Sequence, residues 1–389
     1  MQYFLLYKLY GLYGLDYFIL THMSLAIYRK YRPLSFSDLL GQETIVKILR
    51  EAAKQDRLSH AYLLSGPRGT GKTTTARLIA KIANCEKRRT DPKVRAKGEP
   101  CNECRACEAI DKGRSLDVVE IDAASNRGID EIRNLKENVR VSPTELSHKV
   151  FIIDEAHMLT KEAFNALLKT LEEPPQYVIM ILATTEVEKI PATIASRSQQ
   201  LHFKRIAILQ IAEKLARIAE KENVTMSKEA LDLIASSGEG SFRDAESLLD
   251  QLISFGKTSV TLEDVEKLVG KVGFGKISEL AGFLLEKNID GALHAISEIQ
   301  EGGYNIAQVA KDLIQYIRRT AVLKYSPEIK DMFLRELTDD HLKILIRHSE
   351  LFQEEHIGLL KLLIEAYGNM RYSQFPIIPL EVAVIEGLK

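Results

Sequence analysis

The sequence predicts an α/β domain built on a parallel sheet, followed by a small helical unit and a second, all-helical domain. Up to about residue 205, short apolar runs rich in β-branched residues alternate with segments of helical periodicity, which is the order that builds a parallel sheet. Beyond that point the amphipathic helical pattern continues to the last residue. The 389 residues are enough for two or three domains.

Four buried strands are expected before residue 205, and a helix should follow the first of them. The strands are predicted at 61–65, 116–121, 150–153 and 177–183, and the helix at 73–83. Later helices are predicted at 208–222, 228–236 and, after a Gly-Glu-Gly breaker, 242–255. These patterns predict three domains at 23–205, 206–270 and 271–389, the last of which contains a Pro-rich patch at 374–379.

The first 22 residues form an aromatic extension. Residues 3–20 carry five Tyr and two Phe, with only Lys8 and Asp16 charged. The stretch lacks the small-residue cleavage site of a secretory signal, and it is shorter than the roughly 20 apolar residues of a membrane span. We expect a poorly ordered extension without function, with a peripheral membrane contact as the alternative. Because no later run has spanning length, we expect a cytoplasmic protein with no stable membrane contact.

The overall charge argues against a dedicated DNA-binding domain. The chain has 53 Lys and Arg against 54 Asp and Glu, for a formal net charge of -1. Any contact with nucleic acid must therefore come from a local basic patch.

Residues 66–73, Gly-Pro-Arg-Gly-Thr-Gly-Lys-Thr, fit the phosphate-binding pattern G-x-x-x-x-G-K-[ST] between a predicted strand and a predicted helix. The glycines let backbone N–H groups surround a phosphate, and the helix N-terminus adds its positive end. Lys72 would reach the β- and γ-phosphates of ATP, and the Thr73 hydroxyl would hold Mg²⁺. The alternative is a glycine-rich turn with a chance lysine. The predicted nucleotide-binding residues are Gly66, Pro67, Arg68, Gly69, Thr70, Gly71, Lys72, Thr73 and Thr74.

A second apolar strand, at 150–153, ends in two carboxylates. Asp154 is expected to order Mg²⁺, and Glu155 to orient and deprotonate the attacking water. The alternative is a helix N-cap followed by an acidic first turn. Residues 154–157 also spell the helicase-like tetrad Asp-Glu-Ala-His, although nothing else in the sequence supports a helicase.

The four cysteines lie close together in the sequence. Cys101, Cys104 and Cys107 have C-x-x-C-x-x-C spacing, and Cys85 lies upstream. Such clustering in a cytosolic chain favours a metal over disulfides, and four thiolates suit a closed, structural Zn²⁺ site. An iron–sulfur cluster and free thiols are the alternatives.

Together these motifs resemble the AAA+ ATPases and, more narrowly, the gamma/tau family of bacterial DNA polymerase III clamp-loader subunits. The resemblance covers residues 23–389. It is carried by residues 28–33, 41–43, 60–64, 66–73, the four cysteines, 120–125, 154–157, 171–175, 183–185, 196–197 and 240–245. It implies an AAA+ P-loop ATPase domain with a zinc module at about 85–107, a helical lid and a helical collar that holds an oligomer together.

The resemblance also implies roles for single residues. Thr185 matches the sensor 1 position, which monitors the γ-phosphate. Arg197 matches an arginine finger that reaches the ATP of a neighbouring subunit, although Ser198 stands where the family has Cys. Arg243 matches sensor 2, which reaches from the lid to the nucleotide of its own subunit. The alternatives are a surface loop arginine for Arg197 and a helix-surface ion pair for Arg243. Residues 28–33 match a segment near the adenine.

The function implied by this resemblance is an ATP-hydrolysing motor that loads a sliding clamp onto primed DNA. The implied partners are the delta and delta-prime subunits, further copies of the chain, the beta sliding clamp, the backbone of primed duplex DNA and, indirectly, single-strand-binding protein. Candidate basic residues for DNA are Arg127, Arg133 and Arg140, beside a helix that Ser125 could cap. The chain ends soon after the expected collar, as a short gamma-like form would.

Three other functions compete with this reading. They are a non-hydrolysing structural subunit of the same complex, another AAA+ DNA-remodelling machine such as a branch-migration motor, and DNA synthesis. Retention of Lys72, Thr73, Asp154 and Glu155 disfavours the first, and the cysteine module with Ser196-Arg197 disfavours the second. No two-metal carboxylate constellation for DNA polymerisation appears outside the ATP site, so the polymerase name describes the complex.

Overall fold

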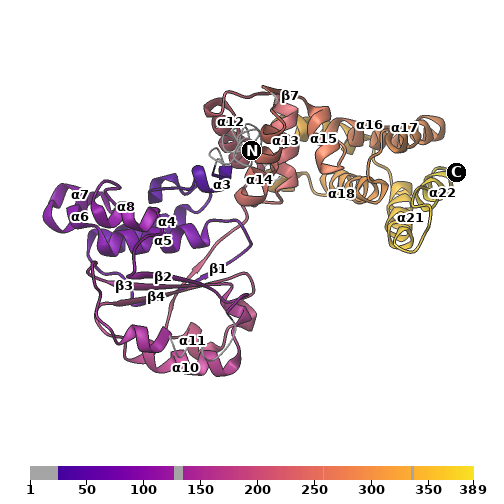
Figure 1. The fold of residues 1–389 in the computed structure, drawn as a ribbon. Helices are drawn as coiled ribbons and strands as arrows, with labels where there is room; N and C mark the ends of the chain where they lie inside the picture. The colour runs from indigo at the N-terminus through magenta and orange to yellow at the C-terminus, as the bar shows by residue number, and fades with distance from the viewer. Residues whose placement is uncertain (1–24, 127–134, 257, 334–336) are drawn as a thin grey trace, which may run out of the picture.

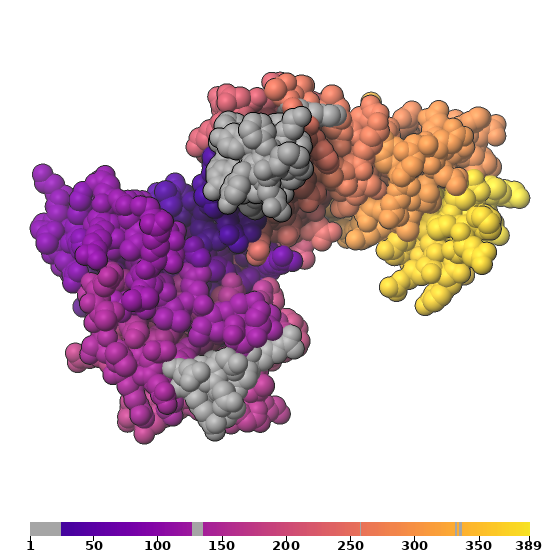
Figure 2. Space-filling model, viewed as in Figure 1, coloured from indigo at the N-terminus to yellow at the C-terminus, as the bar shows by residue number. Residues whose placement is uncertain are grey.

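The computed structural model describes residues 25–126, 135–256, 258–333 and 337–389. Figure 1 shows an α/β unit, a helical unit beside it and a second helical unit that carries the C-terminus. In the space-filling view this last unit extends away from the α/β unit (Figure 2). The predicted 1–22 extension lies outside the described residues. In the described part of the chain, no helix combines the length and the apolar character needed to cross a membrane.

The α/β unit contains a five-stranded sheet in which all neighbours are parallel, in the order β2-β3-β4-β1-β5. Its strands are β1 Ala61–Ser65, β2 Val118–Asp122, β3 Lys149–Asp154, β4 Val178–Thr184 and β5 Gln199–His202. The four predicted strands are present, but β2 begins later than predicted, because residues 116 and 117 form a turn in which the Val118 N–H donates to the Ser115 carbonyl at 3.4 Å. The sequence pattern missed β5, an edge strand in which only Leu201 is buried.

Helices cover both faces of this sheet, as its apolar strands require. One core packs Leu49 and Ile79 against the sheet, and the other contains Phe151 and Leu167. Figure 1 shows α4 and α5 on one face and α10 and α11 on the other. The described helices before residue 205 are α3 Ile27–Lys30, α4 Glu43–Lys54, α5 Lys72–Asn84, α6 Glu86–Thr90, α7 Pro92–Lys97, α8 Arg105–Asp111, α10 Lys161–Glu172 and α11 Ala192–Ala195, with 3-10 turns at Phe36–Asp38, Ala156–Met158 and Val187–Lys189.

The middle unit has its own apolar core. Ile27, from the start of the described chain, packs into that core with Ile211, Leu215 and Leu249, so the segment before the α/β unit contacts the middle unit. The elements are α12 Ile208–Lys221, α13 Lys228–Ser237, α14 Phe242–Ser254 and α15 Leu262–Val269, with a two-residue pair formed by β6 Thr225–Met226 and β7 Ser259–Val260.

The C-terminal unit is helical throughout its described residues and has a separate core. Its final helix begins inside the Pro-rich patch, with Pro376 at the N-cap and Pro379 in the first turn, where a helix does not need the missing N–H. The elements are α16 Phe274–Leu285, α17 Ile289–Glu301, α18 Ile306–Tyr325, α19 Lys330–Phe333, α20 Asp339–Leu351, α21 Glu355–Met370 and α22 Ile377–Leu388, with a 3-10 turn at Pro327–Ile329.

A buried carboxylate joins the two helical units. Glu266, on α15, has 2% of its side chain exposed and accepts the Gly273 backbone N–H at 2.7 Å. It also accepts the Tyr304 hydroxyl at 2.7 Å and lies 3.0 Å from the Lys276 ammonium. The carboxylate belongs to the middle unit and these three partners belong to the C-terminal unit, so the connection between the units is specific.

Candidate functional site

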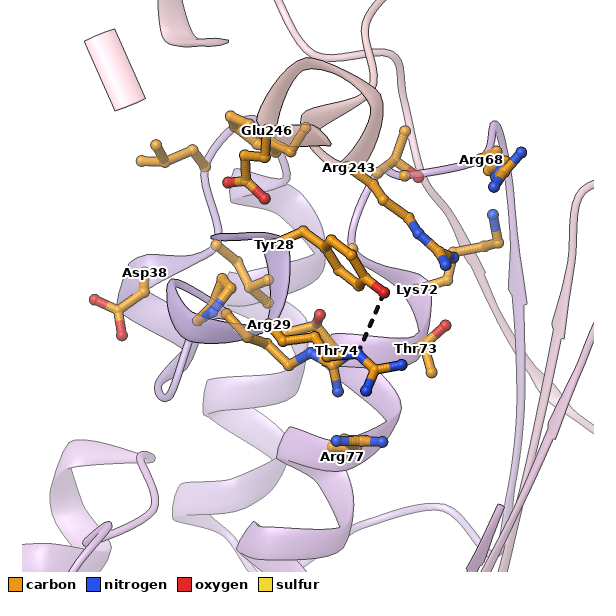
Figure 3. A pocket seen from close by; sticks show the side chains of 18 of the residues that line it. Tyr28, Arg29, Asp38, Arg68, Lys72, Thr73, Thr74, Arg77, Arg243 and Glu246 are labelled. Atoms are coloured by element: carbon orange, nitrogen blue, oxygen red, sulfur yellow. Dashed lines mark hydrogen bonds between the residues drawn. The ribbon is translucent and has the colours of Figure 1, made fainter. Parts of the chain in front are cut away.

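A cavity of about 260 Å³ lies where the α/β unit, the N-terminal segment and the middle unit meet. Figure 3 shows Tyr28 in the centre, Arg29 and Thr74 below it, and Lys72 and Thr73 beside it, with the Arg243 side chain extending towards Lys72. Of the predicted nucleotide-binding residues, Arg68 and residues 69–74 line the cavity.

The loop between β1 and α5 has the backbone that the glycine pattern predicts. Gly66, Gly69 and Gly71 have φ values of 142°, 71° and 101°, which favour glycine. A Cβ at Gly69 would lie 1.8 Å from the Ser241 hydroxyl oxygen, and one at Gly66 would lie 2.4 Å from a backbone oxygen. Substitution at either position would therefore displace the loop.

Lys72 is held inside this loop. Its ammonium donates to the carbonyls of Gly66 and Pro67, each at 2.8 Å, and the residue is 6% exposed. Burial lowers the pKa of Lys72, while the carboxylates of Glu155 and Asp154 oppose that shift. Gly66 and Pro67 do not line the cavity, and they contact Lys72 through these carbonyls.

The two carboxylates at the end of β3 face the start of α5. The Thr73 hydroxyl donates to Asp154 Oδ2 at 2.7 Å, and the Glu155 backbone N–H donates to Asp154 Oδ1 at 3.0 Å. The Glu155 backbone is left-handed, with φ of 49°. Its carboxylate accepts the hydroxyl of Thr185, the residue after β4, at 3.2 Å. The structure thus brings all four side chains together.

The middle unit closes the cavity from the opposite side. The Phe242 backbone N–H donates to the Gly69 carbonyl at 3.1 Å, which ties α14 to the glycine-rich loop. The Arg243 guanidinium carbon lies 5.0 Å from the centre of the Tyr28 ring. A hydrogen bond from Arg29, marked in Figure 3, lowers the pKa of Tyr28.

Two ion pairs at the cavity were not assigned from the sequence. Arg77, one turn after Thr73 on α5, pairs with Glu120 at 2.5 Å. Lys214 pairs with Glu246 at 2.7 Å, and burial raises the pKa of that carboxyl. The spacing of Arg77 from Thr73 was an available signal, because residues four apart share a helix face. Lys214 and Glu246 belong to different helices, so no local pattern joins them.

The remaining predicted site residues lie elsewhere. Arg197 does not line the cavity, and its guanidinium contacts Glu172 at 2.7 Å and the Thr193 carbonyl at 2.9 Å. Arg140 is exposed. Arg127 and Arg133 lie outside the described residues.

The four cysteines come together in one cluster. The sulfur atoms of Cys85, Cys101, Cys104 and Cys107 all lie within 4.8 Å of one another, and none forms a disulfide. Tetrahedral zinc with bonds of about 2.3 Å places its sulfurs about 3.8 Å apart, and those of Cys101 and Cys107 are 3.9 Å apart. Backbone N–H groups also point at the sulfurs of Cys85 and Cys101. A hydrogen bond with Cys107 lowers the pKa of Cys85. The donor set therefore fits zinc.

Family models of DNA polymerase III subunits match three successive parts of the chain. Residues 41–207 match the delta subunit model, 210–258 the clamp loader subunit ATPase lid domain, and 260–387 domain III of the gamma and tau subunits.

Curated relatives carry corresponding names. DNA polymerase III subunit tau of Bacillus subtilis is 42% identical to this chain over 93% of the chain's residues. The matched region covers 62% of that relative's length. DNA polymerase III subunit gamma of Buchnera aphidicola subsp. Baizongia pistaciae is 37% identical over 78% of this chain and 80% of the relative. The same subunit of Buchnera aphidicola subsp. Schizaphis graminum is 38% identical over 83% of this chain and 87% of the relative.

Proposed function

This chain belongs to the gamma/tau family of DNA polymerase III clamp-loader subunits, and we propose that it binds and hydrolyses ATP as the motor that loads a sliding clamp onto primed DNA. One observation carries the proposal. Lys72 and Thr73 at the start of α5 meet Asp154 and Glu155 from the end of β3 at one cavity, and Arg243 reaches in from α14.

The proposed chemistry follows from these groups. Lys72 would exchange its two carbonyl partners for phosphate oxygens, and Thr73 with Asp154 would hold Mg²⁺, which would neutralise phosphate charge. Glu155 would take the proton of the attacking water, and Thr185 would orient that carboxylate. Arg243 would contact the nucleotide from the lid, and Tyr28 and Arg29 would lie beside it.

The position of Arg197 supports a role in a neighbouring subunit. Its side chain is 36% exposed and outside its own cavity, and Glu172 holds it on the surface. We infer that it is presented to the ATP of a second subunit, where a positive charge would stabilise the transition state.

A structural zinc ion is the proposed occupant of the cysteine cluster, held by Cys85, Cys101, Cys104 and Cys107. We also infer a division into ATPase, lid and collar at 23–205, 206–270 and 271–389. Separate cores support this division, except that Ile27 packs into the core of the middle unit. The proposed partners are delta and delta-prime subunits, further copies of this chain, a sliding clamp and the backbone of primed DNA, and the proposed location is the cytoplasm.

The deciding experiment is ATP turnover by the purified chain mixed with delta and delta-prime subunits, with and without sliding clamp and primed DNA. We expect strong stimulation by clamp and DNA, and we expect Lys72→Ala to abolish turnover because it removes the buried ammonium at the phosphates. Lys112→Ala, which removes a lysine from an exposed surface pair, is the control and should leave turnover unchanged. Turnover that ignores clamp and DNA would contradict the clamp-loading function and leave an ATPase of another task.

A further inference from the structure

His157 lies beside the predicted catalytic carboxylate but has no role in the chemistry described so far. It belongs to the 3-10 turn Ala156–Met158, directly after Glu155. Only 7% of its side chain is exposed, although it does not line the nucleotide cavity. A buried imidazole next to a general base is in a position to influence that base.

The ring nitrogens of His157 contact the last residue of β4 and the turn that follows it. Nε2 lies 3.2 Å from Glu186 Oε1, and Nδ1 lies 3.0 Å from the Thr184 hydroxyl oxygen. Because a carboxylate only accepts, the contact with Glu186 requires a proton on Nε2, and attraction between Nδ1 and Glu155 requires a second proton on Nδ1. The Thr184 oxygen also accepts the Glu186 backbone N–H at 3.0 Å. These bonds fix the ring to the end of β4.

The same ring faces Glu155, which stands at the end of the neighbouring strand β3. The distance from His157 Nδ1 to Glu155 Oε2 is 3.5 Å, and that oxygen also accepts the Thr185 hydroxyl. Glu155 is 33% exposed, so its carboxylate is otherwise free to turn towards solvent. A general base must lie within hydrogen-bond reach of its proton, which makes restraint of this carboxylate important for rate.

We propose that His157 is a positioning residue for ATP hydrolysis. Its ring, held by Thr184 and Glu186, confines the Glu155 carboxylate to the place beside Thr185, and so couples the ends of β3 and β4. The inference rests on the proposed ATPase function. A residue that only filled space between the strands would affect stability and would not act selectively on the chemical step.

The test compares kcat, KM for ATP and melting temperature of the assembled complex in a set of variants. We expect His157→Ala to lower kcat by about tenfold or more, because misplacement by about 1 Å can cost up to about 10²-fold, and to change KM less than about twofold. His157→Asn, whose amide can lie near the Nδ1 position, should recover part of kcat. His294→Ala, at an exposed histidine of α17, is the control and should match the wild type.

Thr184→Val tests the same restraint from its other end. It removes the hydroxyl that orients the ring but preserves the shape of a fully buried side chain. We expect it to lower kcat, and we expect the double variant with His157→Ala to lose no more than the single His157 variant, because coupled residues are not additive. Should His157→Ala fail to fold, His157→Asn and Thr184→Val still decide the question.

An unchanged kcat in His157→Ala, or independent effects in the double variant, would overturn the inference while leaving the ATPase function intact. The inference would also be overturned if His157→Ala lowered kcat only in proportion to its melting temperature and His157→Asn recovered none of the lost activity. Absence of turnover in the wild-type complex would overturn both the proposed function and this inference.

Discussion

Gly69 shows how closely the loop between β1 and α5 approaches α14. Its φ of 71° favours glycine, and the Ser241 hydroxyl occupies the space that a Cβ would need. The neighbouring Phe242 N–H donates to the carbonyl of the same glycine. The identity of this residue therefore affects both the conformation of the loop between β1 and α5 and the position of α14.

We expect Gly69→Ala to weaken ATP binding by about tenfold or more, because the loop or the lid must shift by about 1 Å to admit the methyl group. Titration with a fluorescent ATP analogue measures the effect. The control is Gly113→Ala, which carries a similar backbone strain at φ of 62° but meets no atom within 4 Å. Equal affinities for the two variants would show that contact with Ser241 is unimportant.

At the scale of elements, the cysteine module is a set of helices that are too short to be stable alone. α6, α7 and α8 have 5, 6 and 7 residues, whereas isolated helices shorter than about 12 residues are marginal in water. The sulfur cluster brings both ends of the module together, and buried Arg88 donates to the Ile82 carbonyl of α5. We infer that metal binding and folding of this module are coupled.

Cys107→Ser should therefore reduce bound zinc from one per chain to nearly none, and it should lower the melting temperature of the ATPase domain. Metal analysis and calorimetry measure the two effects. Glu103→Gln is the matched control, because it removes an exposed carboxylate between two of the cysteines and leaves all four thiols. Full zinc content in Cys107→Ser would contradict the four-cysteine site.

At the scale of the whole molecule, the nucleotide cavity and Arg197 occupy separate parts of one chain. The cavity lies against the lid, while Arg197 is held by Glu172 at the end of α10. This separation predicts that catalytic sites form between subunits.

A mixing experiment tests that arrangement. Lys72→Ala and Arg197→Ala should each abolish stimulated turnover when present as the only copy type. A mixture of the two should recover part of the activity. The Arg197→Ala chain keeps an intact cavity, and a neighbouring Lys72→Ala chain can supply the intact Arg197 to it. If Arg197 acts within its own chain, the mixture will stay as inactive as its components.

The sequence alone determined the parallel sheet, the family resemblance and most of the proposed nucleotide-site residues. Strands β1, β3 and β4 are buried on both faces, so they read as continuous apolar runs, and the glycine pattern is visible because it reflects local backbone conformation. The cysteine spacing identified a candidate metal site for the same local reason.

Only the tertiary structure decided the contacts between distant segments. β5 is a polar edge strand whose existence depends on β1, and Ile27 contributes to the core of a unit that begins almost 180 residues later. The Lys214–Glu246 pair and the link from Glu186 through His157 to Glu155 join residues on different elements. Local periodicity carries no information about such distances, because they are set by how the completed elements pack together.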